Sequence, residues 1–130
     1  MNIEVGDYVR TSAGKIDKVI NNNYYMPRYI ECEKGIVNKE NIVKHSKNII
    51  DLIDVGDYVN GEKVLNIRRV AEDIEPFKTE ISKKEIAICI FKTGDEEYYK
   101  TRKEKDIKTI LTKEQMEANQ YVVKWNMEAN

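Results

Sequence analysis

The sequence predicts a mainly β protein made of two small, consecutive barrel-like modules, residues 1–50 and 51–130, with one short helix in the C-terminal part. A repeat is the first observation behind this. Ile3–Val9 (IEVGDYV) recurs fifty positions later as Ile53–Val59 (IDVGDYV), with one acid exchanged for another. A hairpin pattern follows each copy, and five short strand patterns fit into the first fifty residues. A small, partly open barrel is an economical way to hide the edges of so many short strands.

The repeated segment has the features of a turn followed by a strand. Its glycine permits the positive φ of a tight turn, its aspartate accepts hydrogen bonds from nearby backbone amides, and its Tyr-Val pair favours a strand. Two carboxylates in identical surroundings are poor candidates for an acid and base pair, which needs two different environments. We therefore predict a structural role for the repeated residues Gly6, Asp7, Tyr8, Gly56, Asp57 and Tyr58.

Five strands are predicted in the first half. Residues 11–14 turn the first hairpin, Gly35 turns the chain again, and residues 38–41 form a helical turn between the last two strands. Pro27 lacks an N–H, so the third strand must place it at an edge or a bulge. The predicted strands cover residues 7–10, 15–20, 24–32, 36–37 and 42–43.

The second half is longer and departs from the first after Val70. Asn60-Gly61 is a type I′ hairpin signal, because both residues tolerate positive φ. Residues 71–76 are acidic and end in proline, which predicts a loop, and residues 77–84 fit no pattern clearly. The predicted strands cover residues 58–59, 63–70, 86–91, 97–102, 107–111 and 121–125, the last including Trp125.

One helix is predicted, over residues 113–119. Thr112 and Gln115 have the spacing of a capping box, in which two side chains satisfy the free amides at a helix start.

The charge balance excludes a polycation. The chain has 22 Lys and Arg against 23 Asp and Glu, a net charge of −1, so it lacks a long-range field that attracts nucleic acid. It has no apolar run as long as a membrane span and no basic start followed by an apolar segment. Cys32 and Cys89 are the only cysteines, and we expect two buried thiols in a cytoplasmic protein.

Catalytic motifs are absent from the sequence. His45 is the single histidine, and no CxxC, HExxH, Gly-rich phosphate loop or Gly-x-Ser-x-Gly is present. We expect a surface histidine, no catalytic residue, no metal site and no cofactor.

Aromatic and basic residues mix in two segments, YYMPRY at 24–29 and YYKTRK at 98–103. Such mixtures can hold single nucleic-acid strands or bases, whereas in a strand one tyrosine of each pair can simply face the core. Acids surround the second segment and cancel its field, while Pro27 and three asparagines expose the first. The candidate binding residues are Tyr24, Tyr25, Arg28, Tyr29, Tyr98, Lys100 and Arg102.

Two resemblances add an expected setting. Each VGDYV with its hairpin resembles the start of SH3-like and KOW-like small barrels, and Ile42–Lys44 after the helical turn is similar to their last strands. The block from His45 to Val64, together with Ile110–Gln115, resembles small proteins of phages and prophages of low-GC Gram-positive bacteria, a family without assigned chemistry. Phage accessory genes of this size often encode inhibitors of host defence, including anti-CRISPR proteins.

These observations and resemblances favour a binding protein over an enzyme. The preferred hypothesis is a non-catalytic phage or prophage accessory protein in the host cytoplasm that inhibits a host protein, such as a defence nuclease complex. The alternatives are a nucleic-acid-binding module that uses residues 24–29 and a sponge for a nucleotide signal. The sequence does not indicate the oligomeric state.

Overall fold

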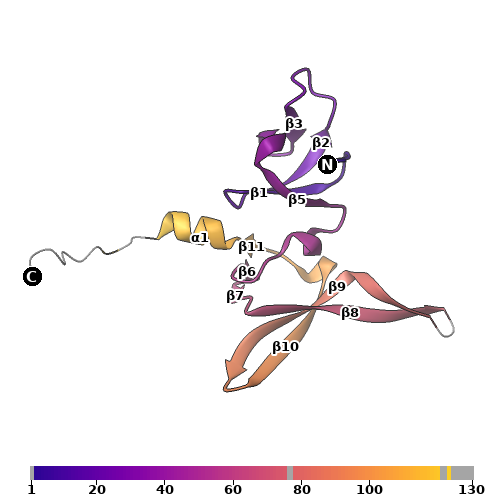
Figure 1. Cartoon of the computed structure of the whole chain (residues 1–130), viewed down its shortest axis with the longest axis vertical. Helices are drawn as coiled ribbons and strands as arrows, with labels where there is room; N and C mark the ends of the chain where they lie inside the picture. Colours follow the sequence, from indigo (N-terminus) through magenta and orange to yellow (C-terminus); the bar gives the residue numbers. More distant parts are fainter. Residues whose placement is uncertain (1, 76–77, 121–122, 124–130) are drawn as a thin grey trace, which may run out of the picture.

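The computed structural model describes residues 2–75, 78–120 and 123, and it is a mainly β protein with 52% strand and 15% helical residues. Its two halves follow one another along the long axis of the molecule (Figure 1). The first half is an antiparallel sheet with the order β4-β3-β2-β1-β5, and a 3-10 turn, η1 (Lys39–Asn41), precedes β5. These strands are β1 (Tyr8–Thr11), β2 (Ile16–Asn21), β3 (Tyr29–Cys32), β4 (Gly35–Asn38) and β5 (Ile42–Ser46).

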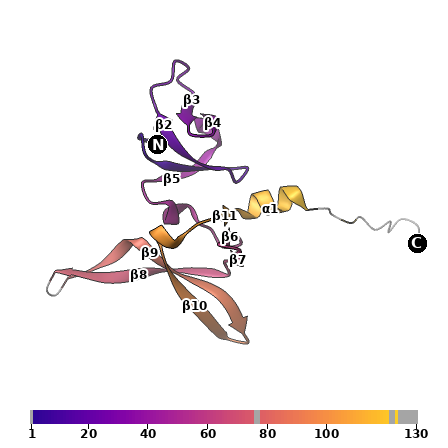
Figure 2. The same ribbon diagram turned by 180° about the vertical axis from the view of Figure 1, so that it is seen from behind.

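The second half contains two three-stranded sheets, with the orders β10-β9-β8 and β11-β6-β7. Two hairpins, β8–β9 and β9–β10, project in different directions from its centre (Figures 1 and 2). The elements are η2 (Ile49–Leu52), β6 (Tyr58–Val59), β7 (Glu62–Lys63), β8 (Asn66–Glu75), β9 (Lys78–Thr93), β10 (Glu96–Lys103), η3 (Glu104–Asp106), β11 (Ile110–Leu111) and α1 (Lys113–Asn119).

The two repeated segments fold into the same turn. The amide of Asp7 donates to the carbonyl of Glu4 over 3.0 Å, and the amide of Asp57 donates to the carbonyl of Asp54 over 3.1 Å. Each aspartate carboxylate accepts the backbone N–H three residues earlier, from Glu4 at 3.0 Å and from Asp54 at 2.8 Å. The intervening glycines have φ values of 91° and 98°, which L side chains rarely adopt. A hydrogen-bonded Gly-Asp turn thus opens each half.

The pairing order of the second half follows that of the first. β11 pairs with β6 as β5 pairs with β1, and a 3-10 turn precedes the closing strand in both halves. β7 pairs with β6 as β2 pairs with β1, and β9 lies between β8 and β10 as β3 lies between β2 and β4, although the second half divides these strands between two sheets. In the part of the chain that the structure describes, the strands do not close into a barrel, and β4 and β5 stay at the two edges of their sheet.

Each half has an apolar core of its own. Strand residues dominate both clusters, because alternate side chains of each strand face inward. The first cluster consists of Ile3, Val9, Val19, Ile30, Cys32, Val37 and Ile42, and the second of Ile50, Ile53, Val59, Val64, Ile86 and Ile88. Cys32 and Cys89 are buried free thiols, as predicted, and burial raises the pKa of the Cys32 thiol to about 11.

A buried arginine joins the halves. Arg10, on β1, is fully buried and donates to both carboxylate oxygens of Asp57, at 2.9 Å from Nη2, and to the carbonyl of Leu52 at 2.8 Å. Its Nη2 also donates to Glu114 on α1 at 2.7 Å, and its Nε lies 3.5 Å from an oxygen of Asp54. Burial alone would lower the pKa of Arg10, but these carboxylates raise it far above its ordinary value. All of these partners come from the second half or from the segment that leads into it.

The prediction of a loop over residues 71–76 is wrong. Strand β8 continues as far as Glu75, and the ambiguous segment after it supplies its partner strand, with Ala71 opposite Ile81 and Glu72 opposite Glu80. These side chains are exposed on a projecting hairpin, where charge is easily hydrated, so acidity is compatible with a strand here. Pro76 lies outside the described residues.

The strand predicted over residues 24–32 begins only at Tyr29. Pro27 cannot donate to a ladder, and the chain makes a turn in which the amide of Tyr29 donates to the carbonyl of Met26 over 3.1 Å.

Two strands of the second half also differ from the prediction. The strand expected over residues 63–70 is divided at Val64. The amide of Val64 donates to the backbone carbonyl of Asp57 at 2.8 Å, while the amide of Leu65 donates to the carbonyl of Cys89, in another sheet, at 2.7 Å. The strand expected over 107–111 is reduced to β11. The strand predicted over 121–125, with Trp125, lies outside the described residues, of which Val123 alone is included.

Two local predictions are confirmed. Asn60 and Gly61 both have positive φ, 50° and 81°, as a type I′ turn requires. Helix α1 has the predicted bounds, and both halves of the capping box between Thr112 and Gln115 are formed. No helix in the described residues is long and apolar enough to cross a membrane.

Candidate interaction site

The loop between β2 and β3 forms one end of the molecule (Figures 1 and 2). Its base is fixed to the first sheet. The Asn22 side chain donates to the carbonyl of Ile3 at 3.1 Å, and the carbonyl of Arg28 accepts the amide of Lys39 at 2.8 Å. The loop is therefore presented on a rigid base, although it contains no regular element.

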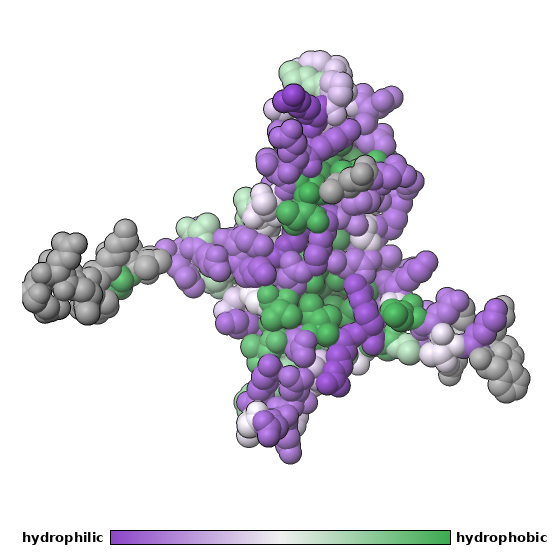
Figure 3. All heavy atoms as spheres, viewed as in Figure 1, coloured by the Kyte–Doolittle hydropathy of each residue, from purple (hydrophilic) through white to green (hydrophobic). Residues whose placement is uncertain are grey.

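The tip of this loop is aromatic and exposed. Tyr25 is 77% exposed and Met26 43%, while Tyr24 and Tyr29 are half-buried beside them. The rings of Tyr24 and Tyr25 lie 4.6 Å apart, centroid to centroid, and a hydrogen bond with the Tyr25 hydroxyl raises the pKa of Tyr24. In Figure 3 this end of the molecule is pale, in contrast to the purple sides of the first half. Two packed rings and a methionine thus face solvent together.

Arg28 supplies the charge of the loop. Its side chain is exposed and forms no ion pair or hydrogen bond with any residue that the structure describes. An arginine that already has a carboxylate partner must exchange it to bind something else. Arg28 has no such cost, so it is available to an anionic group on a partner.

The second predicted cluster lies on β10, and a glutamate of β7 neutralises its two candidate cations. Lys100 and Arg102 both bind the carboxylate of Glu62, Lys100 at 3.4 Å. The hydroxyl of Tyr98 donates to Glu96 at 2.8 Å, and its ring lies 5.4 Å from that of Phe91. The two candidate cations of this cluster, Lys100 and Arg102, are therefore already paired.

The structure does not bring the two clusters together. The β2–β3 loop and β10 lie at opposite ends of the long axis in both views (Figures 1 and 2). Residues 24–29 and residues 98–102 cannot contribute to one small binding site.

Comparisons with known proteins identify no relative. No family model, curated protein or solved structure matches this chain. Its function must therefore be inferred from its own surfaces.

The repeated aspartates are engaged in structural contacts. Asp7 binds Lys47 at 3.0 Å and Nδ1 of His45 at 3.0 Å, in addition to its own turn. Asp57 binds Arg10 and accepts the amide of Lys113 at 2.9 Å. Both carboxylates are buried, 4% and 0% exposed, so these contacts favour the predicted structural role.

The repeated tyrosines lie beside two different hollows. Tyr8 has the Lys18 ammonium 5.5 Å from its ring and lines a groove between the two halves. Tyr58 lines another hollow together with Met116 of α1. Among the described residues, no three His, Cys, Asp or Glu side chains are grouped to hold a metal ion.

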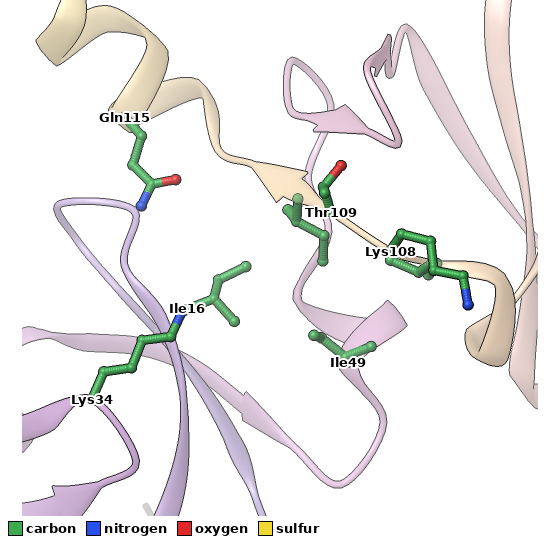
Figure 4. A pocket seen from close by; sticks show the side chains of 8 residues that line it. Ile16, Lys34, Ile49, Lys108, Thr109 and Gln115 are labelled. Atoms are coloured by element: carbon green, nitrogen blue, oxygen red, sulfur yellow. The ribbon is translucent and has the colours of Figure 1, made fainter.

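Two surface hollows lie between the halves, and the sequence does not indicate either of them. The smaller, of about 200 Å³, has Ile16, Lys34 and Gln115 on one side and Ile49 and Thr109 on the other (Figure 4). The larger, of about 690 Å³, runs past Tyr8, Ile49 and Ile107, and three lysines and three glutamates surround it, namely Lys84, Lys103, Lys105, Glu72, Glu85 and Glu104. Because these charges balance, the larger groove has no preference for anions or cations.

Glu104 lines the larger groove, and the fold raises the pKa of its carboxyl. Burial raises the pKa of its carboxyl, Asp51 adds to the rise, and Lys84 and the amides of Ile49 and Ile50 oppose it. Its Oε2 is buried without a hydrogen-bond partner in the described part of the chain. A carboxyl whose pKa is raised by folding stabilises the fold while it is protonated, and this contribution is lost as pH rises through the raised pKa.

We expect the variant Glu104→Gln to melt at a higher temperature than the wild type at neutral pH, because glutamine has no charge to desolvate. The difference should disappear near pH 4, where the wild-type carboxyl is itself protonated. Thermal unfolding followed by circular dichroism across this pH range measures it. A variant that is less stable at pH 7 would show that the contacts to η2 outweigh the cost of burial.

Proposed function

We propose that this chain is a non-catalytic binding protein that recognises a partner protein through its β2–β3 loop. The observation that carries the proposal is the combination, on one loop, of exposed Tyr25 and Met26 with Arg28, which has no partner among the described residues. Tyrosine, methionine and arginine are enriched in the centres of protein interfaces, and tyrosine and arginine dominate binding energies there.

The residue types of the loop indicate which partner surface would fit it. The rings and the thioether would fill an apolar recess, and the guanidinium would pair with a carboxylate beside it. The loop contributes one cation, Arg28, so a protein that offers an apolar pocket next to an acid fits better than a phosphate backbone, which needs several.

We further propose that the two halves are tandem copies of an SH3-like module. The same Gly-Asp turn, the same pairing of first and last strands, and a 3-10 turn before the last strand support this. Departures between duplicated units are natural places for function. The β2–β3 loop is one of them, since its counterpart in the second half is the regular β8–β9 hairpin.

The biological setting is also a proposal. The resemblance of residues 45–64 and 110–115 to phage and prophage proteins supports a role as an accessory protein in the cytoplasm of a low-GC Gram-positive host. The partner would be a host protein that the chain inhibits, such as a defence nuclease complex, in the manner of an anti-CRISPR protein.

Affinity capture from a host lysate tests the proposal. We expect the tagged full-length chain to retain a specific protein, and we expect Tyr25→Ala and Arg28→Ala each to weaken the complex about tenfold or more, the effect of removing an interface hot spot. Arg68→Ala is the matched control, because this arginine is equally charged, 67% exposed and located on the second half. Equal binding by all three variants would contradict the role of the loop.

A gel shift with mixed oligonucleotides tests the main alternative, in which the loop binds nucleic acid. Exposed rings beside an arginine are also a stacking platform for single-stranded nucleic acid. We expect no shift even at low salt, where electrostatic binding is strongest. A shift that Tyr25→Ala abolishes would replace the protein partner with a nucleic acid.

A further inference from the structure

Strand β10 has one free edge. β9 is its only hydrogen-bonded neighbour among the described residues, and the sheet order β10-β9-β8 leaves the other side of β10 without a strand. Its length of eight residues, Glu96–Lys103, exceeds that of the edge strands β4 and β5. A long edge with unpaired backbone groups is a template for another strand.

The charges along this edge are segregated. Glu96 begins the strand, Asp95 immediately precedes it in the β9–β10 turn, and Lys103 is at its end. All three are exposed, and none forms an ion pair with a residue that the structure describes. Among the described residues, no strand beside this edge of β10 supplies partners for these three charges.

We propose that β10 is a dimerisation edge, at which two copies of this chain pair antiparallel about a two-fold axis through Tyr99. In this register Asp95 of each copy lies opposite Lys103 of the other, and Glu96 lies opposite Arg102. Such a contact is isologous and closes after two copies. The two three-stranded sheets join into one continuous sheet.

The register through Tyr99 also brings a ring and a cation together. Tyr98, Lys100 and Arg102 alternate along β10 and therefore share a face, while the pairing with β9 shifts between Tyr98 and Tyr99. Opposite residues of an antiparallel pair share a face, so Tyr98 of each copy meets Lys100 of the other, a ring beside a cation.

The adjacent registers are less favourable. An axis through Lys100 would place two lysines against each other at the centre and Glu96 against Glu104. An axis through Tyr98 shortens the overlap and moves Asp95 away from Lys103. The register through Tyr99 pairs residues 96–102 of the two strands and places acids against bases at both ends.

The dimer would give the molecule two well-separated binding loops. Because β10 and the β2–β3 loop lie at opposite ends of the long axis (Figures 1 and 2), joining two copies at β10 leaves both loops at the outer ends. The dimer is inferred from β10 alone and does not rest on the proposed function. Mass measurements test the dimer and lysate capture tests the loop, so each can fail separately.

Sedimentation equilibrium of the full-length chain tests the proposal. We expect the wild type to dimerise with increasing concentration, and Lys103→Glu to weaken the dimer about tenfold, because it places two acids opposite each other. The double variant Asp95→Lys/Lys103→Glu exchanges the two charges and should restore the dimer. Lys105→Glu, the same change just outside the strand, is the matched control and should have no effect.

Three outcomes would overturn the proposal. A wild-type protein that stays monomeric at every concentration excludes dimerisation at the edge of β10. A dimer that Lys103→Glu and Lys105→Glu weaken equally responds to net charge and not to register. A charge-exchanged double variant that stays monomeric with an unchanged far-ultraviolet circular dichroism spectrum places the dimer contact elsewhere.

Discussion

Replacing Asp57 by asparagine is expected to lower the free energy of unfolding by about 3–5 kcal/mol, the cost of removing one member of a buried ion pair. Asp57 and Arg10 are both fully buried, and the carboxylate receives two donors from the guanidinium and one from each of the amides of Asp54 and Lys113. Without the charge, Arg10 keeps the carbonyl of Leu52 and, as counter-ions among the described residues, only Glu114 and Asp54, whose side chains are 26% and 27% exposed. Urea unfolding followed by circular dichroism measures the loss.

Asp7→Asn is the matched control, because Asp7 occupies the same position of the repeat. Its ionic partner Lys47 is 51% exposed, so water can replace the lost carboxylate, and we expect a cost of about 1–2 kcal/mol. The double variant Arg10→Met/Asp57→Asn should lose less than the sum of its single changes, since it leaves no unpaired charge in the interior. If Asp7→Asn costs as much as Asp57→Asn, burial of the ion pair is not what distinguishes the two sites.

Replacing Gly14 by alanine is expected to cost about 2–4 kcal/mol, the sum of an unfavourable backbone conformation and an overlap. Gly14 has a φ of 86°, and a methyl group there would overlap Oγ1 of Thr112 and lie 2.8 Å from Cβ of Glu114. Thr112 is fully buried and donates to the carbonyl of Gly14 at 2.8 Å, while it also caps α1. The methyl group would therefore push the start of α1 away from the first half.

Gly61→Ala controls for the backbone term. Its φ of 81° is close to that of Gly14, and no atom lies within 4 Å of the added methyl group, so we expect a cost of about 1 kcal/mol. Chemical denaturation gives the two costs, and amide hydrogen exchange should show faster exchange in α1 for Gly14→Ala alone. Equal costs and equal exchange would mean that the contact between the β1–β2 turn and α1 adds no stability.

Local signals in the sequence were sufficient for the turns and the helix. The Asn60-Gly61 pair, the capping box at Thr112 and the apolar run at residues 86–91 each depend on neighbours in the chain, and each has the predicted form. The extent of β8 and β9 was not predictable in this way. Their acidic and mixed segments become strands because each provides the other with backbone partners across a long hairpin, which composition does not reveal.

The candidate site was predicted in part. Tyr25 and Arg28 stood out because proline and asparagine mark an exposed loop, and the structure leaves both side chains exposed. Lys100 and Arg102 look equivalent to them in sequence, but Glu62, some forty residues away, binds both. Long-range ion pairs of this kind decide which charges stay available, and one sequence contains no signal for them.

Arg10 was missed for the same reason. It lies in a strand that alternation would place half in water, and its carboxylates come from residues 54, 57 and 114. A comparison of the two copies offers one signal, since the arginine occupies the position of Asn60 in the second copy. An unmatched charge inside a repeat is thus a reason to look for a partner in the other unit.

The position of Arg10 also bears on whether either half can exist alone. The guanidinium belongs to the first half, and its counter-ions Asp54, Asp57 and Glu114 belong to the second. A fragment that ends near residue 50 would therefore expose the arginine without any of these carboxylates, and a fragment that begins there would leave Asp57 without its guanidinium. For truncation or exchange of parts, the two halves form one unit.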